Sequence, residues 1–103
     1  MSSDLGRSLL LHQSDNVAIA LEAFAPNTEV VLLPDRRQRI LVIETVPEGH
    51  KFSIFDIHAG EPVIKYGEVI GLATRDIRAG ELVHVHNVAS RRGRGDRKEL
   101  RDP

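Results

Sequence analysis

Short apolar runs alternate with clusters of turn-forming residues along most of the chain. The runs are rich in Val, Ile and Leu, and β-branched residues favour strands. Gly, Pro, Asn and Asp separate the runs at intervals of about 8–12 residues, a spacing typical of all-β domains. The pattern therefore predicts a mostly β domain, with strands near residues 8–12, 28–33, 39–44, 51–57, 63–66, 68–71 and 81–86.

One segment departs from this pattern. Residues 17–23 contain Ala, Leu and Glu, which favour helix, and either Asp15 or Asn16 precedes them as a capping residue. The sequence therefore predicts one or two short helical turns within an otherwise all-β fold.

An eight-residue phrase occurs twice in the chain. It reads Asp-Ile-His-Ala-Gly-Glu-Pro-Val at residues 56–63 and Asp-Ile-Arg-Ala-Gly-Glu-Leu-Val at residues 76–83. Gly60 and Gly80 allow turn conformations that a Cβ atom disfavours. The aspartate that opens each copy can accept hydrogen bonds from turn amides. We interpret both copies as structural turns rather than as ligand contacts.

Polar and apolar positions alternate most clearly after the second copy. In a strand over residues 81–86, Val83 and Val85 would face the core, and His84 and His86 would share the opposite face. Strand geometry then places the two histidines about 6–7 Å apart at their Cα atoms. The alternation therefore predicts a pair of imidazoles on one exposed face.

Composition fits one globular domain with an aliphatic core. The chain has 103 residues, of which 41% are hydrophobic and 4% aromatic. It has no cysteine, which excludes disulfides, thiolate metal ligands and a cysteine nucleophile. Neither a signal peptide nor an apolar run of membrane-spanning length is visible. We therefore expect a cytoplasmic protein that does not associate with membranes.

Charge is distributed unevenly, although the formal net charge is only −1. Residues 91–103 hold six Lys or Arg against three Asp or Glu and lack apolar periodicity. The remaining residues are acidic on balance and poor in aromatics, so we expect no nucleic-acid binding. The predicted organisation is an N-terminal arm at residues 1–7, one β domain at residues 8–90 and a basic flexible tail at residues 91–103.

Several motifs resemble a known family. Residues 73–81 are similar to the signature of the SAF domain, a β-clip module. A longer set of motifs, between residues 8 and 88, resembles the N-terminal domain of altronate and galactarate dehydratases and the small subunit of sulfolactate sulfo-lyase. The resemblance implies a β-clip fold over residues 8–90. The motifs are Asp15-Asn16-Val17-Ala18, Gly49-His50-Lys51, the run from Gly60 to Gly67, Ile70-Gly71 and Val83-His84-Val85-His86-Asn87.

The resemblance also implies a function. In that family a much larger domain or subunit carries most of the active site. We therefore expect a small accessory subunit or domain of a hydro-lyase or sulfo-lyase, inactive without its large catalytic subunit. The reaction would eliminate water or sulfite from a sugar acid or a related hydroxy acid. The alternative is a non-catalytic SAF binding module that recognises a small acidic ligand or a protein partner. A homo-oligomer is compatible with so small a core.

Elimination next to a carboxylate requires a base for the α-proton, an acid for the leaving group and an electrophile, usually a metal ion. Histidine and lysine can fill these roles, although each candidate also has an ordinary interpretation as a solvated strand or turn residue. The catalytic candidates are His84 and His86; the substrate-binding candidates are Lys65, Tyr66, His50 and Asn87; the candidate ligands of a divalent Fe, Mn or Mg ion are His84, His86 and His12.

Overall fold

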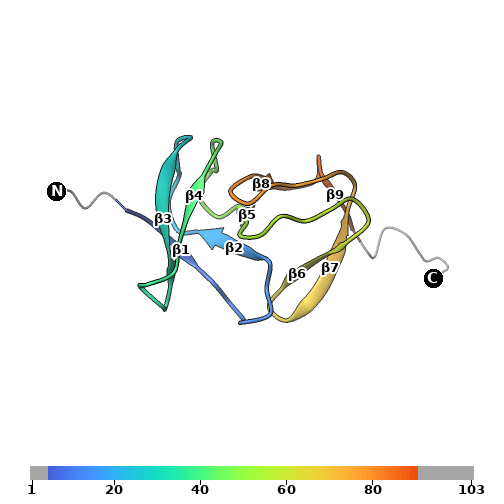
Figure 1. Cartoon of the computed structure of the whole chain (residues 1–103), viewed down its shortest axis with the longest axis horizontal. Coiled ribbons are helices and arrows are strands. Elements are labelled where there is room, and N and C mark those ends of the chain that lie inside the picture. The colour runs from blue at the N-terminus through green and yellow to red at the C-terminus, as the bar shows by residue number, and fades with distance from the viewer. Residues whose placement is uncertain (1–4, 91–103) are drawn as a thin grey trace.

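The computed structural model describes residues 5–90. These residues form nine strands in two sheets and no helix (Figure 1). One sheet has the order β4-β3-β1-β2-β5-β8 and the other the order β6-β7-β9. The all-β prediction is confirmed for this part of the chain. The strands are β1 (Gly6–Leu9), β2 (Val17–Ala20), β3 (Thr28–Leu33), β4 (Arg39–Val42), β5 (Lys51–Ser53), β6 (Pro62–Lys65), β7 (Glu68–Ala73), β8 (Leu82–Val83) and β9 (Val88–Ser90).

The β domain begins earlier in the chain than predicted. Strand β1 begins at Gly6, inside the segment predicted to be an arm. The basic tail predicted at residues 91–103 lies outside the described residues. Within the described part, no helix is long and apolar enough to cross a membrane.

The segment predicted to form helical turns is strand β2. It pairs with β1 on one side and with β5 on the other, both antiparallel. Val17, Ala18 and Ala20 are each only 1% exposed. The helical prediction was wrong because burial in the middle of a sheet outweighs the weak helical preference of Ala and Leu.

Buried apolar side chains form two clusters, and β2 contributes to both. Successive residues of a strand point to opposite faces, so Val17 enters one cluster while Ala18 enters the other. The first cluster consists of Ala18, Ala20, Phe24, Val30, Leu32, Val42, Val46 and Phe52. The second consists of Val17, Ile57, Val63, Ala73, Ile77 and Val83.

Each cluster contains a pair of facing turns. Phe24 and Val46 exchange two backbone hydrogen bonds, of 2.8 and 3.0 Å, in the first cluster. Ile57 and Ile77 exchange two bonds of 2.8 and 2.7 Å in the second. The second pair is the repeated phrase, so its two copies face each other. The first pair has the same backbone arrangement without the repeated sequence.

The two copies of the repeated phrase also cross-link through their aspartates. Asp56 accepts a hydrogen bond from the Ala79 amide, and Asp76 accepts one from the Ala59 amide, each at 2.9 Å. The repeat is therefore a structural device, as the sequence indicated, but each aspartate bonds to the other copy.

In each of these four turns, a residue with a left-handed backbone conformation lies three positions after the residue that bonds to the facing turn. Glycine and asparagine adopt that conformation with least strain. The four are Asn27, Gly49, Gly60 and Gly80, with φ angles of 68°, 82°, 88° and 93°.

Candidate functional site

The chain leaves β8 through a tight turn that Asn87 holds in place. The Asn87 amide N–H donates to the His84 carbonyl at 3.1 Å. The Asn87 side chain accepts from the His84 amide at 3.0 Å and donates to the Leu82 carbonyl at 2.8 Å. Asn87 is 1% exposed. Its side chain is therefore buried and bonded to the backbone of the turn, and its role as a substrate contact stays a prediction.

The predicted alternation along residues 81–86 stops at Val83. Strand β8 ends there, and Val85 is 80% exposed instead of facing the core. His84 and His86 are both exposed, but they lie on a turn rather than on one face of a strand. The prediction of a regular strand was wrong because the bonds made by Asn87 close a turn where the period of two would have continued.

Two histidines from different segments of the chain lie in contact. The ring centroids of His50 and His84 lie 5.0 Å apart, with an angle of 55° between the ring planes. His50 precedes β5, and β5 pairs with β8. His50 Nδ1 lies 3.3 Å from the Glu48 carbonyl. A carbonyl oxygen only accepts, so Nδ1 carries a proton, and neutral His50 presents the lone pair of Nε2.

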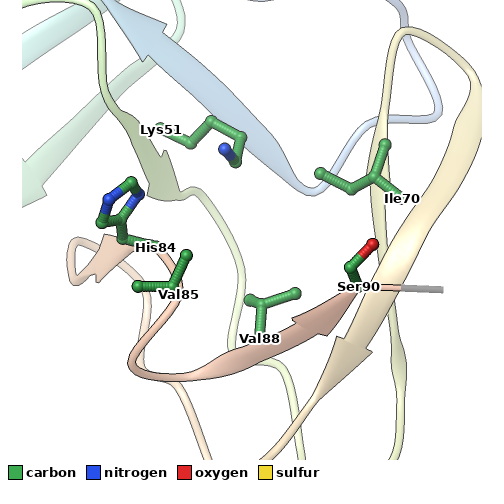
Figure 2. Close-up of a pocket in the computed structure, with 6 residues that line it drawn as sticks. All are labelled: Lys51, Ile70, His84, Val85, Val88 and Ser90. Carbon is green, nitrogen blue, oxygen red and sulfur yellow. The ribbon is translucent and has the colours of Figure 1, made fainter. Parts of the chain in front are cut away.

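A hollow of about 200 Å³ lies beside His84. Figure 2 shows Lys51 on one side of it and two valines on the other, with His84 and Ile70 at opposite ends. The elements that line it are β5, β7, β9 and the turn after β8. Its lining residues are Lys51, Ile70, His84, Val85, Val88 and Ser90.

Lys51 is the charged residue of this hollow that the sequence did not single out. It is half-buried. Burial lowers its pKa from the ordinary value of 10.5, and the nearby positive charge of Lys65 lowers the pKa further. Lys65, a predicted substrate contact, is therefore within electrostatic range of Lys51. The only sequence signal for Lys51 was its place beside His50 in the Gly-His-Lys motif.

Tyr66 lies elsewhere, on the turn that joins β6 to β7. Figure 1 shows this turn on the lower side of the molecule and β8 on the upper side. Lys65 pairs with Glu68, so Tyr66 and Gly67 form a two-residue turn, with φ angles of 57° and 77°. Tyr66 is 72% exposed. The structure therefore does not bring Tyr66 into the lining of the hollow.

Asp15 fixes this turn from beneath. Its carboxylate accepts hydrogen bonds of 2.8 Å from the amides of both Tyr66 and Gly67, and it is 2% exposed. Asn16 extends the link by exchanging side-chain bonds with the backbone of β6. The Asp-Asn motif found in the sequence therefore positions the Lys-Tyr-Gly turn.

His12, a predicted metal ligand, lies against the same turn. A Cβ atom added to Gly67 would lie 3.3 Å from the His12 ring. Nδ1 of His12 accepts from the Ser14 amide at 3.1 Å, so the proton of the neutral ring is on Nε2. Metal binding at His12 would therefore require this contact with Ser14 to break.

The described residues alone do not provide a complete set of metal ligands. No group of three or more His, Asp or Glu side chains gathers in this part of the chain. His50 and His84 come close enough for their rings to contact, and His86 lies two residues further along the same turn. A divalent ion held by this turn would need further ligands from a substrate or from another chain.

Two sheets whose buried clusters share strand β2, with a pair of facing turns in each cluster, define a β-clip module of the SAF class. Residues 6–91 match the altronate/galactarate dehydratase SAF domain family. The chain belongs to this family, which confirms the predicted family and β-clip fold.

Two kinds of relative differ in size. The chain is 47% identical over 77 residues to altronate dehydratase of Escherichia coli (strain K12), which covers 75% of this chain but 15% of that protein. It is 39% identical over 75 residues to galactarate dehydratase (L-threo-forming) of the same organism, covering 71% of this chain and 13% of that protein. It is 39% identical over 88 residues to (2R)-sulfolactate sulfo-lyase subunit alpha of Chromohalobacter salexigens, covering 81% of this chain and 94% of that protein.

Proposed function

We propose that this chain acts as the small accessory subunit of a hydro-lyase or sulfo-lyase whose large catalytic subunit is a separate polypeptide. The observation that carries the proposal is the match to a sulfo-lyase subunit alpha over 94% of that subunit's length. The dehydratases that also match are several times longer, since the chain covers only 13–15% of them. The substrate would be a sugar acid or a related small hydroxy acid.

The turn after β8 supports a role for His50 and His84 at the interface with the large subunit. His50 presents an Nε2 lone pair, which can accept a proton, and the imidazole of His84 lies beside it. Elimination requires one group to accept the α-proton and another to protonate the departing group. Two imidazoles in contact can share these tasks, with Lys65 as an additional substrate contact.

The predicted divalent metal ion stays part of this proposal. His86 would supply one ligand from the turn, His84 would supply another if His50 alone carries the proton transfer, and the large subunit or the substrate would supply the remainder. The ion, whether Fe, Mn or Mg, would stabilise negative charge that develops on the substrate beside its carboxylate.

Reconstitution tests the proposed function. The full chain is mixed with the large subunit from the same organism, and elimination of water from altronate and galactarate, and of sulfite from sulfolactate, is measured. We expect no turnover by either chain alone and turnover by the mixture. Turnover by the large subunit at the same rate without this chain would contradict the proposal.

Histidine variants then test the site in the reconstituted enzyme. We expect His84→Ala and His50→Ala each to lower kcat by about 100-fold, the contribution typical of a proton-transfer group. His86→Ala should also lower kcat, through loss of a metal ligand. His58→Ala is the matched control, because His58 is exposed on a turn of the repeat. If the His86 variant turns over as fast as the unmodified pair, the role assigned to His86 is wrong.

A further inference from the structure

The hollow beside His84 combines positive charge with an apolar surface. Lys51 reaches into it from β5, and Val85 and Val88 lie opposite (Figure 2). His84 lies at one end and Ile70 at the other. None of the six lining residues, all within the described part of the chain, is acidic. The lining therefore provides positive charge and no carboxylate to balance it.

The charge of Lys51 is held in an unfavourable setting. The side chain is half-buried against apolar residues, which reduces its hydration. Lys65 adds a second positive charge nearby. An anion placed in the hollow would interact favourably with both ammonium groups, whereas a neutral ligand would leave the repulsion between them unrelieved.

We propose that this hollow binds the carboxylate of a small hydroxy acid, with Lys51 Nζ as its ion-pair partner. His84 contributes a second hydrogen-bond donor at the rim, and Val85, Val88 and Ile70 contact the carbon chain. The inference rests on the proposed function for the identity of the acid, but not for the presence of the anion site.

The size of the hollow favours a small free acid. A volume of about 200 Å³ is below the range of about 300–1,000 Å³ that is usual for drug-sized ligands. It suits a short hydroxy acid such as a sugar acid. The acidic side chain of a protein partner carries the same group, and the experiment separates these two sources.

Titration of the full chain, without any large subunit, tests the proposal. Backbone amide signals are followed by NMR while galactarate is added, with galactitol as the neutral analogue of the same carbon skeleton. We expect saturable shifts at Lys51, His84 and Val85 with galactarate and none with galactitol. Lys51→Met should weaken binding by at least tenfold, as expected for the loss of a hydrogen bond to a charged group.

Arg39→Met is the matched control. It removes one positive charge from β4, the edge strand at the opposite end of the same sheet from β8, so we expect binding to change by less than twofold. Lys51→Arg keeps the charge and should retain more affinity than Lys51→Met.

Three results would overturn the anion site. The first is equal binding of galactitol, and the second is unchanged affinity in Lys51→Met. The third is an absence of saturable shifts combined with weaker association of Lys51→Met with the large subunit, which would assign Lys51 to a protein contact. A failed reconstitution of lyase activity would leave the titration unaffected, so the two proposals can fail separately.

Discussion

Lys51 and Asn87 both lie in motifs that the chain shares with its family, but their side chains have different roles. Asn87 is buried, and its side-chain amide forms hydrogen bonds that hold the turn after β8 in place. Lys51 keeps its ammonium group at a hollow where burial and Lys65 both lower its pKa. A charge kept in an unfavourable place is typical of a site at which stability is lost in favour of binding.

The destabilising effect of the Lys51 charge can be measured through the pH dependence of the protein's stability. The folded state holds the Lys51 proton less tightly than the unfolded chain, in which lysine titrates near 10.5. The resulting loss of stability is therefore complete below the lowered folded pKa, shrinks as pH rises towards 10.5 and vanishes above it. We expect Lys51→Met to unfold at a higher temperature than the unmodified chain at pH 7, with a smaller difference above pH 10.5. Thermal unfolding at both pH values measures the change.

The Arg39→Met variant again serves as control, since it removes an exposed charge on another strand. It should show no comparable gain at pH 7. An unfolding temperature of Lys51→Met equal to or below that of the unmodified chain at pH 7 would argue against a destabilising charge at Lys51.

At the scale of elements, the β6–β7 hairpin presents an exposed aromatic residue on a strained backbone. Two-residue hairpin turns with positive φ at both positions favour Asn-Gly. This hairpin has Tyr66 in the first position, with φ at 57°, and Asp15 bonds both turn amides from below. The element is therefore held rigidly while its first residue carries conformational strain.

Tyr66→Asn relieves this strain. We expect the free energy of unfolding to rise by about 1 kcal/mol, because asparagine adopts the left-handed conformation at lower cost than tyrosine. Urea unfolding of the isolated chain measures the change. Tyr66→Phe is the matched control: it keeps the strain and should leave stability unchanged, and its kcat in the reconstituted enzyme reports on the hydroxyl. Stability of Tyr66→Asn below that of the unmodified chain would contradict the prediction.

At the scale of the whole molecule, the turns of the second cluster also contact the first cluster. The Ile43 amide donates to the Gly80 carbonyl at 3.0 Å. Gly80 packs so closely on the strand end at Leu41 that a Cβ atom would collide with the Leu41 carbonyl oxygen. Gly60, at the same position of the other copy, has nothing within 4 Å of such an atom. The two copies therefore share a backbone but differ in their surroundings.

Alanine at these two glycines separates conformational cost from packing cost. Gly60→Ala should destabilise the fold by about 1–2 kcal/mol, the cost of a left-handed L-residue. Gly80→Ala should lose about 1–3 kcal/mol more, because the added methyl group also forces the two clusters apart. Urea unfolding of both variants gives the comparison. Equal losses would show that the contact between Gly80 and Leu41 does not hold the clusters together.

Sequence determined what depends on local chemistry. Turn residues and β-branched runs were enough to predict an all-β fold, and the repeated phrase marked two structural turns with glycine at the left-handed position. The family motifs supported the β-clip assignment. They also pointed to the segments after each copy of the repeated phrase as the places where site residues should lie. Local propensity failed at Val17–Ala20, where pairing and burial from distant strands outweigh the preference of Ala and Leu.

Only the tertiary structure decided which side chains meet. His50 and His84 are far apart in the chain and come together because β5 pairs with β8. Lys51 became a candidate through the hollow that three separate segments enclose, and burial assigned the Asn87 side chain to holding a turn. Burial and the spacing of distant segments depend on how the sheets pack, which no local pattern specifies. The sequence therefore determined the strands and turns, whereas packing decided the site.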